Sequence, residues 1–313
     1  MAELLRLLGG SVALRPYVFV FLAVYLVAAV TKMGWRRTAA FTAIAWAVAY
    51  GAEFSSTRNG FPFGLYHYVD VTRDRELWLS NVPFFDSLSF SFLCYVGFAV
   101  AVLVWSPILV VRGDVQVADT RAVRTSARVA FTGAFLTMLL DLVIDPVTVL
   151  GERWFLGRIY WYPEGGIHFG VPLSNYAGWF LVALVTLLAF QALERTVFAR
   201  GGAAAGVRHV PYAALLEPGV YLGIVGFNLA VTFWIGETAL GVVGVMLFAP
   251  VVLFLWTHLA HPMRRATAAD VARHLRDFPE SRIAVAASAG VRAARPADGT
   301  EPLAGDPAAP PPA

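Results

Sequence analysis

The stretch FFDSLSFSFLCYVGFAVAVLVWSPILVV, residues 84–111, decides the fold class, because its 28 positions hold one charged residue. A helix needs about 20 mostly apolar residues to cross the hydrocarbon core of a bilayer. Six further windows approach this length and composition: Pro16–Thr31, Thr38–Phe54, Ala127–Ile144, Tyr176–Leu193, Ala213–Ile235 and Ala239–Leu259. The pattern predicts an all-α, polytopic membrane helix bundle with about seven transmembrane helices.

The composition of the whole chain agrees with this prediction. Of the 313 residues, 58% are hydrophobic and 14% are charged, whereas a soluble domain carries about 25% charged residues. This excludes an ordinary soluble enzyme and a disordered chain, and the lone Cys94 excludes a disulfide scaffold. The net charge of +3 gives no support to nucleic-acid binding.

Three regions are expected along the chain. Residues 1–262 form the transmembrane domain, residues 263–295 a cytoplasmic amphipathic or linker segment, and residues 296–313 a disordered tail rich in Pro and Ala. Within the second region, Ala266–Phe278 has the pattern of a short amphipathic helix that lies at the membrane interface.

The basic residues predict an orientation in the cell membrane. With seven spans, the loops after the first, third and fifth spans share a side with the C-terminus, and together with it they carry 17 of the 24 basic residues. Because basic loops stay in the cytoplasm, we expect an integral protein of the cytoplasmic (inner) membrane with its C-terminus inside.

Two segments resemble each other and suggest an internal repeat. Val82–Phe90 and Val171–Trp179 both read V-P-x-x-[D/N]-x-x-x-aromatic, and each follows a loop rich in Gly and aromatic residues. The alternative is that proline is simply common at helix starts. A repeat of two helix–loop–helix units would place both loops on the same face of the membrane.

Acidic residues inside apolar helices are costly, so each one is a candidate functional residue. Asp141 and Asp145 are four residues apart and share one helix face, and Asp141 has apolar neighbours on both sides. Glu53 ends an apolar run that begins at Ala45. For these three acids, function is favoured over structural pairing.

Three other acids lie at expected helix ends. Asp86 begins the window at 84–111, which leaves a helix cap and a functional role equally open. Glu217 precedes Pro218 near a helix start, and Glu237 lies in a short turn, so both are predicted to be interfacial.

The loops at 61–68 and 160–170 are dense in aromatic residues and are interleaved with Gly and Pro. An interfacial aromatic belt explains part of this density. Irregular backbone at membrane depth is tolerated only where it is buried or lines a cavity, so the loops also predict an apolar groove with aromatic walls. His67 and His168 occupy similar places in the two loops, but no metal-ligand spacing is present, and no motif for a nucleotide or redox cofactor occurs.

Three blocks, taken together, carry a resemblance to a known family: EFSSTRNGFPFGLYHY at 53–68, DLVIDPV at 141–147, and YWYPEGGIHFGVPLSNYAGW at 160–179. In order and spacing they closely resemble the membrane carotenoid biosynthesis protein family, which includes the carotenoid 1,2-hydratases and bisanhydrobacterioruberin hydratase. The resemblance runs from the window at Thr38–Phe54 to the window at Tyr176–Leu193, and it extends more weakly to the window at Ala239–Leu259.

The resemblance implies a hydro-lyase that adds water to the terminal C1=C2 bond of an acyclic, lycopene-like carotenoid end group. The product is a tertiary alcohol, and the reaction is redox-neutral and needs no cofactor. The implied partners are the polyene in the bilayer, water as co-substrate, and other enzymes of carotenoid biosynthesis.

The residues fit this chemistry. Water adds to such an alkene after protonation, so the site needs a carboxyl group that still holds its proton and an environment that stabilises a tertiary cation. Burial and a second nearby carboxylate both favour the protonated form, and aromatic faces attract cations. The predicted catalytic residues are Asp141, Asp145, Glu53, Asp86 and Asn175. The predicted substrate-binding residues are Phe61, Phe63, Tyr66, Tyr68, Trp161, His168 and Trp179.

Rival functions are weighed against the same residues. A retinal-binding photoreceptor needs a lysine in its last helix, and the only lysine is Lys32. The alternative that stays open is a membrane transporter or a non-catalytic carotenoid-binding protein that uses the same intramembrane acids. A transporter predicts a water-filled path across the membrane, whereas a hydratase predicts a pocket closed at one end.

Overall fold

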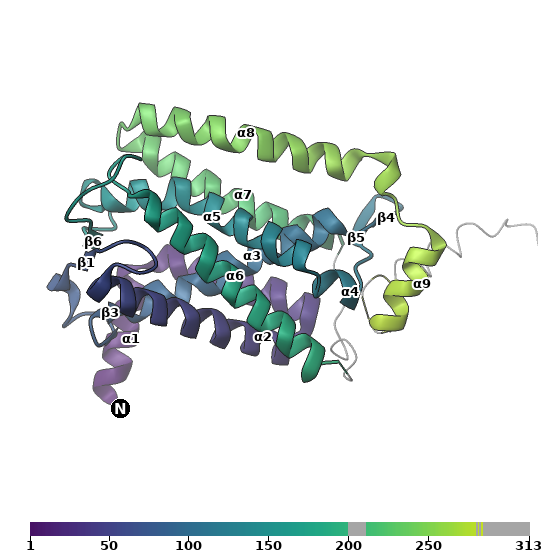
Figure 1. Ribbon diagram of the computed structural model, residues 1–313, viewed down its shortest axis with the longest axis horizontal. Helices are drawn as coiled ribbons and strands as arrows, with labels where there is room; N and C mark the ends of the chain where they lie inside the picture. The colour runs from purple at the N-terminus through teal and green to yellow at the C-terminus, as the bar shows by residue number, and fades with distance from the viewer. Residues whose placement is uncertain (200–210, 280, 282, 284–313) are drawn as a thin grey trace, which may run out of the picture.

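The computed structural model describes residues 1–199, 211–279, 281 and 283 of the chain. Six of the helices in this part are long and apolar enough to cross a membrane: α2 (Pro16–Asn59), α3 (Phe84–Trp105), α5 (Ala127–Val149), α6 (Leu173–Thr196), α7 (Ala213–Trp234) and α8 (Thr238–Ala260). They pack side by side as one elongated bundle (Figure 1). The predicted polytopic helix bundle is confirmed.

Helix α2 contains both the first and the second predicted span. Its backbone is non-helical at Gly34 (φ 80°, ψ 161°), a conformation that favours glycine. The Tyr25 hydroxyl lies 2.7 Å from Thr42 Oγ1. Residues 17 positions apart would be about 25 Å apart in a straight helix. The two legs of α2 therefore run antiparallel, which gives the seven spans that the sequence predicts.

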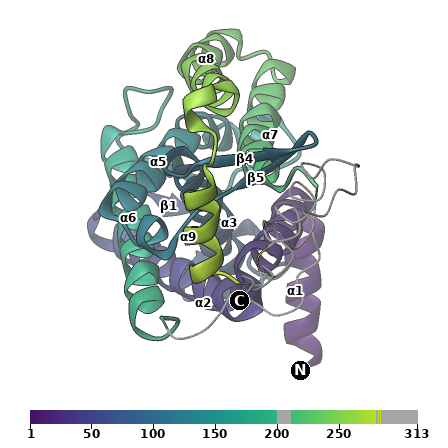
Figure 2. The ribbon, with the colours of Figure 1, turned by 90° about the vertical axis from the view of Figure 1, so that its right-hand side faces the viewer.

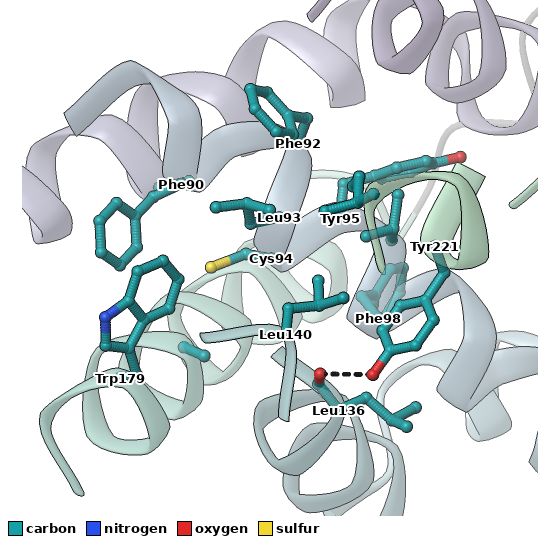
Figure 3. Close-up of a cluster of buried hydrophobic side chains, with 14 of the residues drawn as sticks. Phe90, Phe92, Leu93, Cys94, Tyr95, Phe98, Leu136, Leu140, Trp179 and Tyr221 are labelled. Carbon is teal, nitrogen blue, oxygen red and sulfur yellow. Dashed lines mark hydrogen bonds between the residues drawn. The ribbon is translucent and has the colours of Figure 1, made fainter. Parts of the chain in front are cut away.

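Helix α3 forms the centre of the bundle, and its side chains are buried from Phe90 to Leu103. Small residues allow its neighbours to come close, as is typical of membrane helices. A Cβ atom added to Gly97 of α3 would lie 2.7 Å from the Gly133 carbonyl oxygen of α5, and one on Gly133 would lie 2.7 Å from Leu187 of α6. Figure 3 shows part of this core, where the Tyr221 hydroxyl of α7 donates to the Leu136 carbonyl oxygen of α5 (2.8 Å).

The predicted span at 84–111 is too long at its C-terminal end. Helix α3 stops at Trp105, because Pro107 disfavours a helical conformation at Ser106. The apolar residues that follow form a hairpin of β4 (Ile108–Val111) and β5 (Asp114–Val117). Its turn is Arg112–Gly113, and both residues have positive φ (52° and 84°), as two-residue hairpin turns require.

The two aromatic loops meet at one end of the bundle. Strands β1 (His67–Tyr68) and β6 (Tyr160–Trp161) pair antiparallel, with Tyr68 opposite Tyr160. A second small sheet, β2 (Trp78–Leu79) with β3 (Val82–Pro83), and helix α1 (Ala2–Leu14) lie at the same end (Figure 1). The loops therefore share one face, as expected. The remaining short elements are the 3₁₀ helices at Asp70–Thr72, Gly151–Arg153 and Pro262–Arg264.

Helix α9 (Ala268–Asp277) lies at the opposite end, beside α4 (Arg121–Arg124; Figure 1) and the β4–β5 hairpin (Figure 2). It forms within the predicted range 266–278, but its buried face packs on protein. His274 Nδ1 lies 2.6 Å from the Asp119 carbonyl oxygen, and the Arg124 guanidinium lies 4.2 Å from the centre of the Phe278 ring. The predicted disordered tail at 296–313 lies outside the described residues.

Glu217 lies near the start of α7, as the sequence predicts, but it packs against neighbouring helices. Its side chain is buried, forms an ion pair with Lys32 Nζ (3.3 Å) and accepts a hydrogen bond from the Tyr95 hydroxyl (3.3 Å). A buried carboxylate needs such partners, and the only lysine of the chain supplies the charge. Glu237 lies in the turn before α8, as predicted, and pairs with Arg153.

Candidate active site

A cavity of about 870 Å³, including its open mouth, lies at the end of the bundle where the two aromatic loops meet. Its walls come from both legs of α2, from α3, α5, α6 and α7, and from the loops around β1 and β6. The lining residues are Tyr17, Val18, Phe21, Glu53, Phe63, Tyr66, Tyr68, Phe85, Asp86, Ser89, Phe90, Phe92, Leu93, Ile144, Asp145, Thr148, Trp154, Ile159, Tyr160, Tyr162, Asn175, Trp179, Ile224, Phe227 and Asn228.

Three carboxyl groups line this cavity, and each comes from a different helix. Glu53 lies near the end of α2, Asp86 in the first turn of α3, and Asp145 near the end of α5. The remaining wall is mainly aromatic and aliphatic. An apolar molecule in this cavity would therefore lie beside acidic groups from three helices.

Asp145 is held by several hydrogen-bond donors. The Tyr160 hydroxyl donates to Asp145 Oδ1 (2.6 Å), and the Tyr162 hydroxyl donates to Oδ2 (3.2 Å). The Asn175 amide also donates to Oδ2 (2.7 Å) and, at 2.5 Å, to Asp141 Oδ2. These contacts fix the Asp145 carboxyl group in one orientation.

Asp141 is completely buried and lies behind Asn175 rather than in the cavity wall. Its carboxyl group lies one helical turn from that of Asp145, and the Asn175 amide bridges the two. Asp141 Oδ1 has no hydrogen-bond partner among the described residues. Tyr160, Tyr162 and Asn175 donate to Asp145, so it has more donors than Asp141 to stabilise a negative charge.

Glu53 and Asp86 each keep one oxygen available to the cavity. Ser87 donates to Glu53 Oε2, and the Tyr68 hydroxyl donates to Asp86 Oδ2 (2.6 Å). Among the described residues, no donor contacts Glu53 Oε1 or Asp86 Oδ1. These two oxygens are therefore free to exchange protons with a bound molecule.

The tyrosines of the loops remain neutral donors. Burial raises the pKa of Tyr68 and of Tyr160 well above the usual value, and the neighbouring Asp86 and Asp145 carboxyl groups raise it further. Burial, followed by the charge of Asp145, also raises the pKa of Tyr162. A phenol that keeps its proton donates to a carboxylate and does not repel it.

Aromatic faces surround the acids. The rings of Phe90 and Trp179 stack with their centroids 4.3 Å apart (Figure 3), and Phe63 packs against both. Tyr66 contacts the Tyr160 ring at 5.6 Å. Each such face attracts a cation by about 0.5–2 kcal/mol, so the cavity is suited to a positively charged intermediate.

Glycines allow the loop after α2 to lie on α6. A Cβ atom on Gly178 would come within 2.6 Å of the Phe63 ring and within 2.8 Å of the Pro62 carbonyl oxygen. Gly64 has φ 95°, a conformation that other residues rarely adopt. The G-x-P-x-G pattern at 60–64 thus positions Phe63 and Tyr66 in the wall.

Most residues predicted from the sequence come together here. Glu53, Asp86, Asp145 and Asn175 line the cavity, as do the predicted substrate-binding residues Phe63, Tyr66, Tyr68 and Trp179.

Three predicted substrate-binding residues lie outside the cavity. The side chains of Phe61 and Trp161 are 64% and 38% exposed. Trp161 alternates with the inward-facing Tyr160 and Tyr162, so its side chain points to the other side of the strand. His168 Nε2 lies 3.2 Å from the Leu142 carbonyl oxygen, and the ring packs on Tyr176.

Other lining residues were not singled out from the sequence. Tyr160 and Tyr162 carry a visible signal, because Y-x-Y occurs in both loops, at 66–68 and 160–162. Tyr17, Phe227 and Asn228 lie in predicted spans far from the two loops, and their sequence surroundings give no such signal. The described residues hold no cluster of three or more His, Cys, Asp or Glu side chains suited to a metal ion.

The fold and the site define a class, namely an integral membrane helix bundle with acidic groups in an aromatic cavity. The comparisons with known proteins agree. The sequence profile described as "Carotenoid biosynthesis protein" matches residues 14–250, and the chain belongs to this family.

One relative is similar over most of its length. The chain is 30% identical to a bisanhydrobacterioruberin hydratase of Haloarcula japonica over 236 residues, which cover 73% of this chain and 70% of the relative. No solved structure matches the chain. The site therefore belongs to a family of carotenoid biosynthesis proteins, and a hydratase is among the relatives of this chain.

Proposed function

We propose that the protein hydrates the terminal C1=C2 double bond of an acyclic, lycopene-like carotenoid end group. One observation carries this proposal: Glu53, Asp86 and Asp145 line a single cavity whose other walls are aromatic and aliphatic. Addition of water to a trisubstituted alkene needs an acid, a base and stabilisation of a cation, and the carboxyl groups and aromatic rings of this cavity are suited to these roles. The hydratase relative supports the same reaction class.

The first step is protonation of the alkene. Glu53 and Asp86 are the candidates for this proton transfer, because each presents an oxygen that no donor among the described residues contacts. One of the two carboxyl groups gives its proton to C2, and the electron pair of the double bond forms the new C–H bond. A tertiary cation remains at C1. A positioned acid of this kind contributes about 10²–10⁴-fold to a rate.

The cation is stabilised by groups that do not move. Asp145 presents a negative charge that Tyr160, Tyr162 and Asn175 hold in place. The faces of Tyr66 and Trp179 add attraction from the wall. Fixed charges and dipoles in a water-poor site stabilise a developing charge at little cost in reorganisation.

The second step is capture of the cation by water. The water oxygen bonds to C1, and one of its protons goes to the second member of the Glu53–Asp86 pair. The product is a tertiary alcohol. The proton then returns to the donor within the cavity that both carboxyl groups line.

The proposal also includes the position of the polyene and the orientation of the protein in the membrane. The polyene is an apolar rod longer than the cavity, so only its end group enters, and the remainder stays in the bilayer. We place the protein in the cytoplasmic membrane with its C-terminus inside, as the distribution of basic residues predicts. Part of that argument rests on basic residues that lie outside the described residues: Arg200, Arg208, Arg282, Arg292 and Arg295.

Expression in a host that makes lycopene tests the proposal. We expect new pigments heavier by one water, about 18 mass units, for each modified end. A culture carrying the empty vector is the control. Unchanged pigment in cells whose membranes contain the protein would contradict the proposal and would favour a binding or transport role.

A further inference from the structure

Asn228 is a buried polar residue that the scheme above does not use. It lies in the apolar C-terminal half of α7, is 6% exposed, and lines the cavity. Its amide nitrogen donates to the Ile224 carbonyl oxygen one turn earlier (2.9 Å). Because that carbonyl only accepts, the amide orientation is fixed and Oδ1 faces the other way. Among the described residues, no donor contacts Oδ1.

Asn228 lies at the same depth in the bundle as the carboxyl groups. Helices α5 and α7 run in the same direction, and Tyr221 of α7 bonds to Leu136 of α5. Further along the two helices, Leu229 (eight residues after Tyr221) and Val143 (seven after Leu136) meet at Gly244 of α8, where an added Cβ would lie 2.6 Å and 3.0 Å from them. Val143 lies between Asp141 and Asp145 in α5, and Leu229 is the next residue after Asn228 in α7. Asn228 and these acids therefore lie at a similar depth in the bundle.

We propose that Asn228 Oδ1 holds the attacking water. This inference rests on the proposed hydration and adds the residue that positions its nucleophile. Asn228 accepts one hydrogen of the water, and the carboxylate of the Glu53–Asp86 pair accepts the other. A water held by both hydrogens keeps a lone pair free to attack C1.

The chemistry requires an acceptor at this place. A donor would bind the lone pair that must form the new C–O bond, and would slow the capture. The amide hydrogen that Asn228 directs to Ile224 is thereby kept away from the water. In the apolar C-terminal half of α7, an unused amide acceptor is costly unless it has a ligand, and a water in the cavity supplies one.

The test is Asn228→Leu, which removes the acceptor at similar volume, assayed in D₂O with a polyene that carries acyclic ends. The Glu53–Asp86 pair is unchanged in this variant, so the cation still forms. Without a positioned water, the cation loses a proton and returns to an alkene. We expect the hydrated product to fall about 10²-fold. The ratio of deuterium in the recovered alkene to hydrated product should rise at least 10-fold.

Thr232→Val is the matched control. Thr232 lies one turn further along α7, bonds to the Asn228 backbone carbonyl and does not line the cavity, so the deuterium ratio should equal that of the wild type. If Asn228→Leu does not accumulate in membranes, Asn228→Val provides the same test.

Two results would overturn the role of Asn228: wild-type behaviour of the variant, or a fall of exchange and hydration in equal proportion. The second result would indicate a structural role alone. Failure of the proposed function is distinguishable, because the wild-type protein itself would then form no hydrated product.

Discussion

At the scale of single residues, the site depends on how Asp145 is held. Tyr160 and Tyr162 both donate to it from the loop around β6. A hydrogen bond to a charged group is worth about 1.5–3 kcal/mol. The two tyrosines thus hold the carboxyl group of Asp145 in one orientation at the cavity wall.

We predict that Tyr160→Phe lowers the hydration rate about 10-fold to 100-fold, because the Asp145 charge loses its closest donor. Initial rates of product formation in membranes, normalised to the amount of protein, measure the effect. Tyr25→Phe is the control, since the Tyr25 hydroxyl bonds to Thr42 outside the cavity. Equal rates for Tyr160→Phe and wild type would show that the hydrogen bond from Tyr160 to Asp145 does not contribute to hydration.

The sequence indicates the acids of the site better than their partners. Glu53, Asp141 and Asp145 stand out because each is charged in an apolar run. Their tyrosine donors do not stand out, since an interfacial aromatic belt has the same composition. Only the pairing of β1 with β6, a contact between residues more than 90 positions apart, shows which rings face inward.

At the scale of elements, helix spans follow from the sequence and their ends do not. The apolar windows locate α2, α3, α5, α6, α7 and α8 because bilayer thickness sets their length. Hydrophobicity continues from α3 into β4, so composition does not distinguish a helix end from a buried strand. The Ser106-Pro107 pair and Arg112–Gly113 turn carry the missing signal.

Close packing of α3 on α5 fixes the wall that carries Asp86 relative to the wall that carries Asp145. We predict that Gly97→Val destabilises the protein, because the new side chain would collide with Thr137 and the Gly133 backbone. Overpacking of this kind costs about 1–3 kcal/mol.

The temperature at which the detergent-solubilised protein loses its main peak in size-exclusion chromatography measures the effect of Gly97→Val. Gly223→Val is the matched control, since a Cβ at Gly223 of α7 has no atom within 4 Å. If both variants melt at the same temperature, close contact between α3 and α5 is not what positions the two acids.

At the scale of the whole molecule, the cavity and the docked helix α9 lie at opposite ends of the bundle. The cavity lies beside β1 and β6, whereas α9 lies beside β4, β5 and α4 (Figure 1). The docking of α9 depends on Asp119, which contacts both Arg124 and His274. The sequence predicts that helix from its amphipathic pattern, but its docking requires tertiary contacts that the pattern does not contain.

Asp119 provides a prediction that depends on pH. Burial by itself raises the pKa of Asp119, but Arg124 and His274 outweigh burial and hold that pKa well below its usual value. A carboxyl group whose pKa falls on folding contributes stability above its unfolded pKa, about 3.9, and that contribution is lost only at lower pH. Asp119→Asn should therefore destabilise the protein at pH 5 by at least as much as at pH 7.

Removal of one partner from a buried ion pair costs about 3–5 kcal/mol, because Arg124 is left uncompensated. Unfolding temperatures of wild type and Asp119→Asn at the two pH values measure the difference. A difference that shrinks at pH 5 would show that Asp119 titrates near its ordinary range and does not act as a permanent anchor.

The central claim is that carboxyl groups in the cavity carry out the proton transfers of hydration. The most direct measurement is the mass-resolved yield of hydrated carotenoid from membranes that contain equal amounts of wild type, Glu53→Gln or Asp86→Asn. We predict that the wild type adds about 18 mass units per modified end and that each variant lowers the yield at least about 10²-fold. Wild-type yields from both variants would contradict the claim.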